Sequence, residues 1–203
     1  MNLNLFPKIF SIFLAASVSL VYLQSCSCSS CGNQEAEVPF EVLNSANKFI
    51  ISKTGKEFFD KYITPDFYHT SKDSIFYNLV YRLYDPEKPF VDGIIKFSVD
   101  TTGRINYNRE ITGIPECLSD QRNCEFNIDE QTAINIAAKD GLEEGIKEWK
   151  TGFIWDPKYG RYVWHILSTI KEIPGEAYKA SGKEIIIDPY SGEIIARNEW
   201  NIR

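Results

Sequence analysis

Few residues in this sequence have the type and spacing that catalysis or metal binding requires. Its only histidines, His69 and His165, form neither an HExxH zinc motif nor a cluster. Cys28 and Cys31 have the CxxC spacing of a thiol-redox motif. Such motifs act at the start of a helix beside a strand, whereas this pair lies in a small, polar segment, which favours a local disulfide or a passive pair. We therefore expect no catalytic residue, no metal site and no cofactor.

Two aspartates, Asp100 and Asp188, are the clearest candidates for a carboxylate pair. Each ends a strand-like run and is followed within a few residues by a glycine, Gly103 or Gly192. Aspartate can accept hydrogen bonds from the backbone of a turn, and glycine tolerates a positive φ. The pattern predicts two tight turns and explains both aspartates without catalysis.

Residues 1–25 have the features of a signal peptide. Lys8 precedes an apolar run over 9–23. As a helix this run would reach about 22 Å, which is short for the ~30 Å core of a bilayer. It ends in Leu23-Gln24-Ser25-Cys26, which resembles the lipobox of bacterial lipoproteins. The resemblance implies that the chain is cut before Cys26, which then carries a diacylglyceryl thioether and an acylated amine.

Ordinary secretory cleavage near Ser25 and an uncleaved anchor are the alternatives to lipidation. Two or more acyl chains would make a stable membrane anchor. Ser27, and not aspartate, follows Cys26, which by the same resemblance indicates the outer membrane, facing the periplasm or the cell surface. Residues 26–38 are expected to form a flexible tether.

The connector 112–126 contains the remaining cysteines, Cys117 and Cys124, which close a loop of eight residues. In an oxidising envelope compartment we expect them to form a disulfide. A loop of this length would contribute about 2–3 kcal/mol in the chain-entropy model. A metal pair is the competing interpretation, but no histidine or third cysteine lies nearby.

The rest of the chain divides into two similar halves, 39–111 and 127–203. Each begins with an amphipathic stretch, at 40–62 and 128–145, and in the second Asn127 is the expected N-cap of a capping box with Glu130. Each half ends in one of the two aspartate-glycine hairpins. The pattern predicts an α+β fold of tandem units, each with one helix packed on a small antiparallel sheet.

The strands expected in these sheets cover 75–84, 90–99, 149–155 and 161–170. In the first of them Ile75, Tyr77, Leu79, Tyr81 and Leu83 alternate with other residues and should share one face. Residues 174–182 are expected to form a long loop before the final hairpin.

The second half resembles the PepSY domain in three segments, 129–137, 162–166 and 187–194, the last being the most specific. The first half matches only through its helix and its Asp100 hairpin. The resemblance implies a non-catalytic domain, since some PepSY-like domains restrain a peptidase and many belong to envelope lipoproteins. A cystatin-like α+β unit shares much of this pattern.

Candidate binding residues come from the aromatic side chains of the second half: Trp149, Trp155, Tyr159, Tyr162 and Trp164. Most of this set, with Phe153, alternates in a way that fits the core face of a sheet. The alternative is an exposed aromatic platform for a peptide or a glycan, and edge strands would also invite strand addition by a partner.

The net charge of −6 argues against a nucleic-acid-binding protein, which normally has a basic surface. The leading hypothesis is a lipid-anchored cell-envelope protein that binds or inhibits a protein or peptide partner, such as a peptidase, without catalysis. The alternatives are a structural or accessory lipoprotein of an envelope assembly, and a thiol-redox enzyme that uses Cys28 and Cys31.

Overall fold

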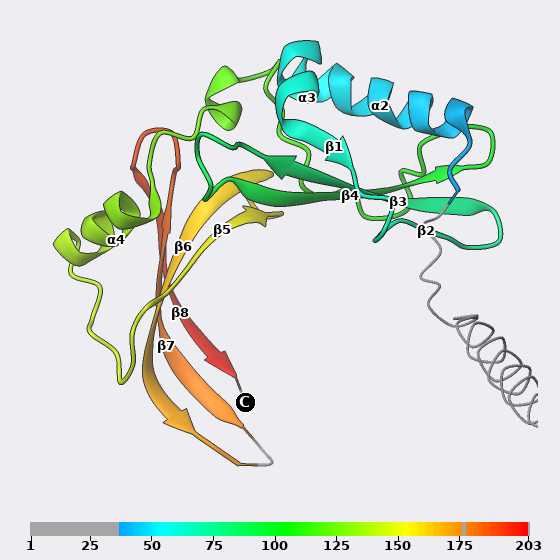
Figure 1. Ribbon diagram of the computed structural model, residues 1–203. Helices are drawn as coiled ribbons and strands as arrows, with labels where there is room; N and C mark the ends of the chain where they lie inside the picture. Colours follow the sequence, from blue (N-terminus) through cyan, green and yellow to red (C-terminus); the bar gives the residue numbers. More distant parts are fainter. Residues whose placement is uncertain (1–36, 176–177, 203) are drawn as a thin grey trace, which may run out of the picture. The chain divides into compact units, whose positions relative to one another are not determined.

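The computed structural model describes residues 37–175 and 178–202, shown in colour in Figure 1. Within these ranges the chain forms three α-helices, one short 3-10 helix and two four-stranded antiparallel sheets. The expected α+β class is therefore confirmed. The expected signal peptide, and the tether as far as residue 36, lie outside the described residues.

Two helices, α2 (Phe40–Thr54) and α3 (Lys56–Tyr62), cover the first sheet. The buried residues of α2 recur every four positions, at Val42, Ala46, Ile50 and Thr54, so one stripe of the helix faces the core. The prediction of a single helix over 40–62 is wrong. Gly55 has a φ of 81° and its N–H donates to the Ile51 carbonyl oxygen at 2.8 Å, which ends α2 before α3 begins.

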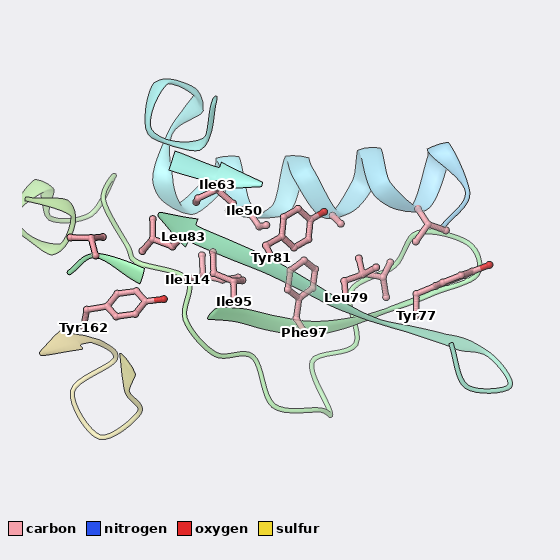
Figure 2. Packing of buried hydrophobic residues seen from close by; sticks show 14 of the residues in the cluster. Ile50, Ile63, Tyr77, Leu79, Tyr81, Leu83, Ile95, Phe97, Ile114 and Tyr162 are labelled. Atoms are coloured by element: carbon pink, nitrogen blue, oxygen red, sulfur yellow. The ribbon is translucent and has the colours of Figure 1, made fainter. Parts of the chain in front are cut away.

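The strands of the first sheet are β1 (Ile63–Pro65), β2 (Ser71–Lys72), β3 (Phe76–Tyr84) and β4 (Asp92–Asp100). β4 pairs with β3, which also pairs with the short strands β1 and β2. The predicted alternation of β3 is confirmed from Tyr77 to Leu83, whose inward side chains pack beneath α2 (Figure 2). Ile75 precedes the strand and is exposed.

The turn at Asp100 is confirmed, but the strand expected after it is not formed. Gly103 has a φ of 87°, and the chain then makes only isolated bridges to β4, at Ile105 and Thr112. The side chain of Asn106 accepts a hydrogen bond from the N–H of Asn108 at 3.0 Å. This local turn competes with a continuous strand.

The second half begins with α4 (Glu130–Lys139), which is shorter than the expected 128–145. Its N-cap is Asp129, whose side chain accepts a 2.8 Å hydrogen bond from the N–H of Thr132, so the prediction of Asn127 as the cap is wrong. The helix ends early because the N–H of Leu142 returns to the Ala137 carbonyl oxygen at 3.0 Å.

The second sheet contains β5 (Lys150–Asp156), β6 (Arg161–Ile173), β7 (Lys179–Ile187) and β8 (Ile194–Ile202), in that order across the sheet. The predicted loop over 174–182 is wrong from Lys179 onward, because Lys179, Ala180 and Ser181 pair with Ile173, Glu172 and Lys171. Position 182 of β7 requires glycine, because a Cβ there would collide with the Ser168 carbonyl oxygen.

Each half has its own cluster of buried side chains, and the β5–β6 hairpin contributes to both. Tyr162 belongs to the cluster beneath α2, whereas Trp164, on the same face of β6, belongs to the cluster beneath α4. Phe90 and Phe153 pack against both clusters. The two expected units therefore share an aromatic boundary.

Candidate functional site

Two of the five candidate binding residues are core residues. Tyr162 and Trp164 are each 2% exposed. Both polar atoms are satisfied inside the protein, since the Tyr162 hydroxyl donates to the Gly113 carbonyl oxygen and Trp164 Nε1 to the Ile128 carbonyl oxygen. Their assignment to an exposed platform is corrected: for these two residues the core-face interpretation holds.

The other three candidates, Trp149, Trp155 and Tyr159, are half-buried. Trp149 packs against the cluster beneath α4, and its Nε1 donates to the Glu143 carbonyl oxygen at 3.2 Å. Tyr159 lies in the turn between β5 and β6, with the Lys158 ammonium 5.1 Å from its ring centre. Trp155 lies in a groove that other aromatic side chains also line.

This groove, which we call the Trp155 groove, has a volume of about 380 Å³ and is formed by three segments distant in sequence. Helix α2, the segment 107–116 and the end of the β5–β6 hairpin each contribute to it. Its lining residues are Phe49, Lys53, Tyr107, Ile111, Ile114, Glu116, Trp155 and Gly160.

The aromatic rings of the groove are held by edge-to-face packing. Phe49 packs against Phe97 of the core at 5.3 Å between ring centres and against Tyr107 at 6.1 Å. Trp155 packs against Tyr162 at 5.4 Å. Tyr107 is 73% exposed, so most of its ring remains open to solvent. The groove therefore offers an anchored aromatic floor with an exposed ring at its side.

A charge pair also lines the groove. The Lys53 ammonium lies 2.8 Å from a carboxylate oxygen of Glu116, and both side chains are partly exposed. Exposed pairs of this kind contribute little to stability. The two groups are therefore available to exchange partners with charged or polar groups of a ligand.

Phe49 lies in the stretch 40–62 that was predicted to be helical, but neither Phe49 nor Tyr107 was predicted as a binding residue. The available signal for Tyr107 was a large aromatic residue isolated in a polar run, between Asn106 and Asn108. Its proximity to Trp155 depends on how the hairpin packs on the first half, which no local pattern reveals.

His165 is a partly buried strand residue whose two ring nitrogens both have partners. It is on the face of β6 opposite to Trp164, and its side chain is 15% exposed. Nδ1 lies 2.7 Å from Glu184 and Nε2 lies 3.2 Å from Asp156. Both ring nitrogens are therefore occupied by carboxylates. Within the described ranges no group of three or more histidine, cysteine or acidic residues could hold a metal ion.

Asp100 and Asp188 act in their turns, as predicted. Asp100 Oδ1 accepts hydrogen bonds from the N–H of Arg104 and from Thr102, and these bonds lower the pKa of Asp100 below its usual value. Asp188 Oδ1 accepts from the N–H groups of Tyr190 and Ser191, at 2.7 and 3.0 Å.

The cysteine predictions have different outcomes. Cys117 and Cys124 form a disulfide with a Cα–Cα distance of 5.4 Å, which confirms the expected pair. Cys26, Cys28 and Cys31 lie outside the described residues, so their expected roles remain predictions. Among the described helices none is long and apolar enough to cross a membrane.

No protein-family model matches the chain, and no curated protein matches it either.

Proposed function

We propose that this protein is a lipid-anchored, non-catalytic binding module of the cell envelope, and that the Trp155 groove binds a segment of a peptide or protein partner. The observation that carries the proposal is the convergence of Phe49, Tyr107 and Trp155 from three distant segments on one groove. Aromatic side chains with one packed and one open face are typical of recognition surfaces.

The chemistry of the groove favours a peptide over a glycan. Ile111 and Ile114 line it together with the aromatic rings, so an apolar side chain would be surrounded by carbon atoms. The Lys53–Glu116 pair supplies one donor group and one acceptor group for the polar backbone or for a flanking charge. The fitting ligand is an apolar side chain within a polar segment.

We include in the proposal that the second half is a PepSY-like domain, and the arrangement of this half supports it. Helix α4 precedes four antiparallel strands, and the Asp188 turn has the hydrogen bonds that its sequence predicts.

The lipid anchor is supported by the sequence around Cys26. Replacing Cys26 with alanine should release the protein from the membrane fraction, and an unchanged membrane-bound product with an uncut N-terminus would contradict the anchor.

The groove is tested by site-specific photo-cross-linking of the full-length protein in its own cells. A photoreactive amino acid at position 107 should capture a specific partner, whereas the same amino acid at position 40 should not. Phe40 is the matched control because it is an aromatic residue with 79% exposure that does not line the groove.

The competing outcomes of this experiment are distinct. Equal capture at both positions, or no capture at position 107, would contradict the groove as the binding surface. Capture at 107 that is lost in a Phe49→Ser variant of unchanged thermal stability would support it. Identification of the partner as a peptidase or as a component of an envelope assembly would separate inhibition from an accessory role.

A further inference from the structure

Strand β8 leaves one edge without a partner in the described part of the chain. It is the last strand of the second sheet (red in Figure 1) and pairs antiparallel with β7 from Ala180↔Ile202 to Ile186↔Ala196. No described backbone group forms a hydrogen bond with its other edge. An edge strand of this length presents a row of backbone donors and acceptors to any chain that can pair with it.

Two oppositely charged residues of β8 flank Asn198. Arg197 and Glu199 are both exposed and flank Asn198, and the strand contains no proline. Edges that avoid pairing often have prolines or charged side chains, lysine above all. Here the two charges are opposite, so they can complement a second copy of the same strand.

We propose that two copies of this chain pair along β8, antiparallel, about a two-fold axis at Asn198. In this register Arg197 faces Glu199 of the second copy, and Glu199 faces the second copy's Arg197. Cross-strand pairs of opposite charge stabilise an antiparallel ladder, whereas like charges destabilise it. The two four-stranded sheets would join into one continuous sheet.

Neighbouring registers are less favourable. Facing residues of an antiparallel pair lie on the same face of the sheet, so an edge-to-edge two-fold axis must pass through a residue position. An axis at Arg197 would oppose two arginines, and an axis at Glu199 would oppose two glutamates. The axis at Asn198 brings both pairs of opposite charges together.

The side chains next to Asn198 leave the edge accessible. The Trp200 ring lies over Gly182 of β7, since a Cβ at Gly182 would lie 2.8 Å from a ring carbon, and Trp200 Nε1 donates to the Lys183 carbonyl oxygen at 3.3 Å. The Asn198 amide also points to β7, where it donates to Glu184 at 3.0 Å. Both side chains lean away from the free edge. In the proposed register Ala196, a small residue, faces Trp200 of the second copy.

Arg197 is held in place by its own chain. Its guanidinium donates two hydrogen bonds, of 2.6 and 2.5 Å, to the carboxylate of Asp140 at the end of α4. A guanidinium has five N–H donors, so others remain for Glu199 of the second copy. The pairing of β7 with β8 is irregular between Ile194 and Ala196, where the register shifts. The proposed ladder between the two copies therefore begins at Ala196 and, by symmetry about Asn198, ends at Trp200.

Cysteine cross-linking of the full-length protein tests the register. Facing residues in an antiparallel pair have Cα atoms about 4.5–5.5 Å apart, within the range of a disulfide. Under mild oxidation Asn198→Cys should therefore form a disulfide between the two copies at position 198, identified by peptide mass spectrometry. Asn201→Cys is the matched control, because its two copies would lie about 20 Å apart along the strands.

Cross-linking at 198 in at least tenfold excess over 201 is the expected result. Equal cross-linking at the two positions, or none at 198 in a folded protein, would overturn the proposal. The native cysteines do not confuse the readout, because mass spectrometry identifies the peptides that are joined.

Charge exchange provides a second test without cysteine. Glu199→Arg should weaken the dimer at least tenfold in sedimentation velocity, because it places Arg197 opposite an arginine. Adding Arg197→Glu should restore much of the association. Glu193→Arg makes the same change in charge outside β8, and Asp140→Asn removes only the internal partner of Arg197. Association should persist in both controls, and a wild-type protein that stays monomeric in the detergent-solubilised full-length form would refute the proposal.

Discussion

The hydroxyl of Tyr162 donates a 3.1 Å hydrogen bond to the carbonyl oxygen of Gly113. Tyr162 comes from β6 in the second half of the chain, yet its ring lies in the cluster beneath α2 (Figure 2). Gly113 can present this oxygen because it has a φ of 79°, and a Cβ there would collide with the Ile94 carbonyl oxygen. The contact joins the connector, β4 and the β5–β6 hairpin, and it lies beneath Trp155 of the proposed binding groove.

Removing the Tyr162 hydroxyl should weaken this junction. In Tyr162→Phe a buried carbonyl oxygen loses its partner, so we expect the free energy of unfolding to fall by about 1–2 kcal/mol. Chemical denaturation measures the change. Tyr107→Phe, at an exposed ring, should leave the free energy of unfolding unchanged, and an equal loss in both variants would contradict a role for the buried bond.

Gly93 should tolerate no side chain. A Cβ at this position in β4 would overlap the hydroxyl and ring of Tyr162, so Gly93→Ala should destabilise the protein by about 1–3 kcal/mol. Gly152→Ala, in β5, is the control, because its Cβ would meet only Ile154 at 3.4 Å. Combining Gly93→Ala with Tyr162→Phe should cost less than the sum of the two changes, and strict additivity would show that the residues do not interact.

Removal of the disulfide should loosen the end of α2. The loop between Cys117 and Cys124 lies against this end, where the N–H of Leu118 donates to the Lys53 carbonyl oxygen at 3.0 Å. Replacing both cysteines with serine should lower the free energy of unfolding by about 2–3 kcal/mol. Hydrogen exchange should accelerate more at Leu118 than in α4, and equal acceleration at both places would contradict a local loosening at the end of α2.

Alkaline pH should destabilise the protein through two buried tyrosines. Burial raises the pKa of Tyr81 and of Tyr162 above the usual value, so the folded state holds these protons more tightly than the unfolded state. Their contribution is complete below about pH 10, where unfolded tyrosine titrates, and is lost as the pH rises toward the folded pKa values. The free energy of unfolding should therefore fall above that pH.

Tyrosine variants separate this effect from other alkaline changes. In Tyr81→Phe the fall in the free energy of unfolding with pH should be shallower than in the wild type, whereas in Tyr107→Phe it should keep the wild-type slope. Urea denaturation from about pH 9 to pH 11 covers the range in which ordinary tyrosines titrate. A wild-type slope in Tyr81→Phe would show that the buried hydroxyl is not responsible.

The best sequence predictions concerned features made by neighbouring residues. The turns at Asp100 and Asp188 form as expected, because an aspartate side chain and the next backbone N–H groups suffice to make them. The Cys117–Cys124 loop also depends on residues close in sequence. The predicted N-cap of α4, Asn127, lies two residues before the actual N-cap, Asp129. Both residue types can cap a helix, and the path of the chain decides which of them does.

Predictions that depended on distant partners were less accurate. Residues 179–182 have a composition suited to a loop, yet they form β7 because β6 and β8 supply hydrogen bonds on both sides. Likewise, the candidate site was expected within one hairpin, whereas the groove requires Phe49 and Tyr107 from the first half. No periodicity within a segment indicates which other segment will cover it.

The sequence by itself determined the α+β class, the two aspartate turns, the disulfide pair and the alternation of β3, because each follows from interactions within one short segment or from the two-residue period of a strand. Only the tertiary structure decided which aromatic side chains are available. Tyr162 and Trp164 share a face of β6 and are buried in different clusters, while Trp155 remains partly open. Burial depends on the surfaces that pack against a strand, and these surfaces come from residues far away in the chain.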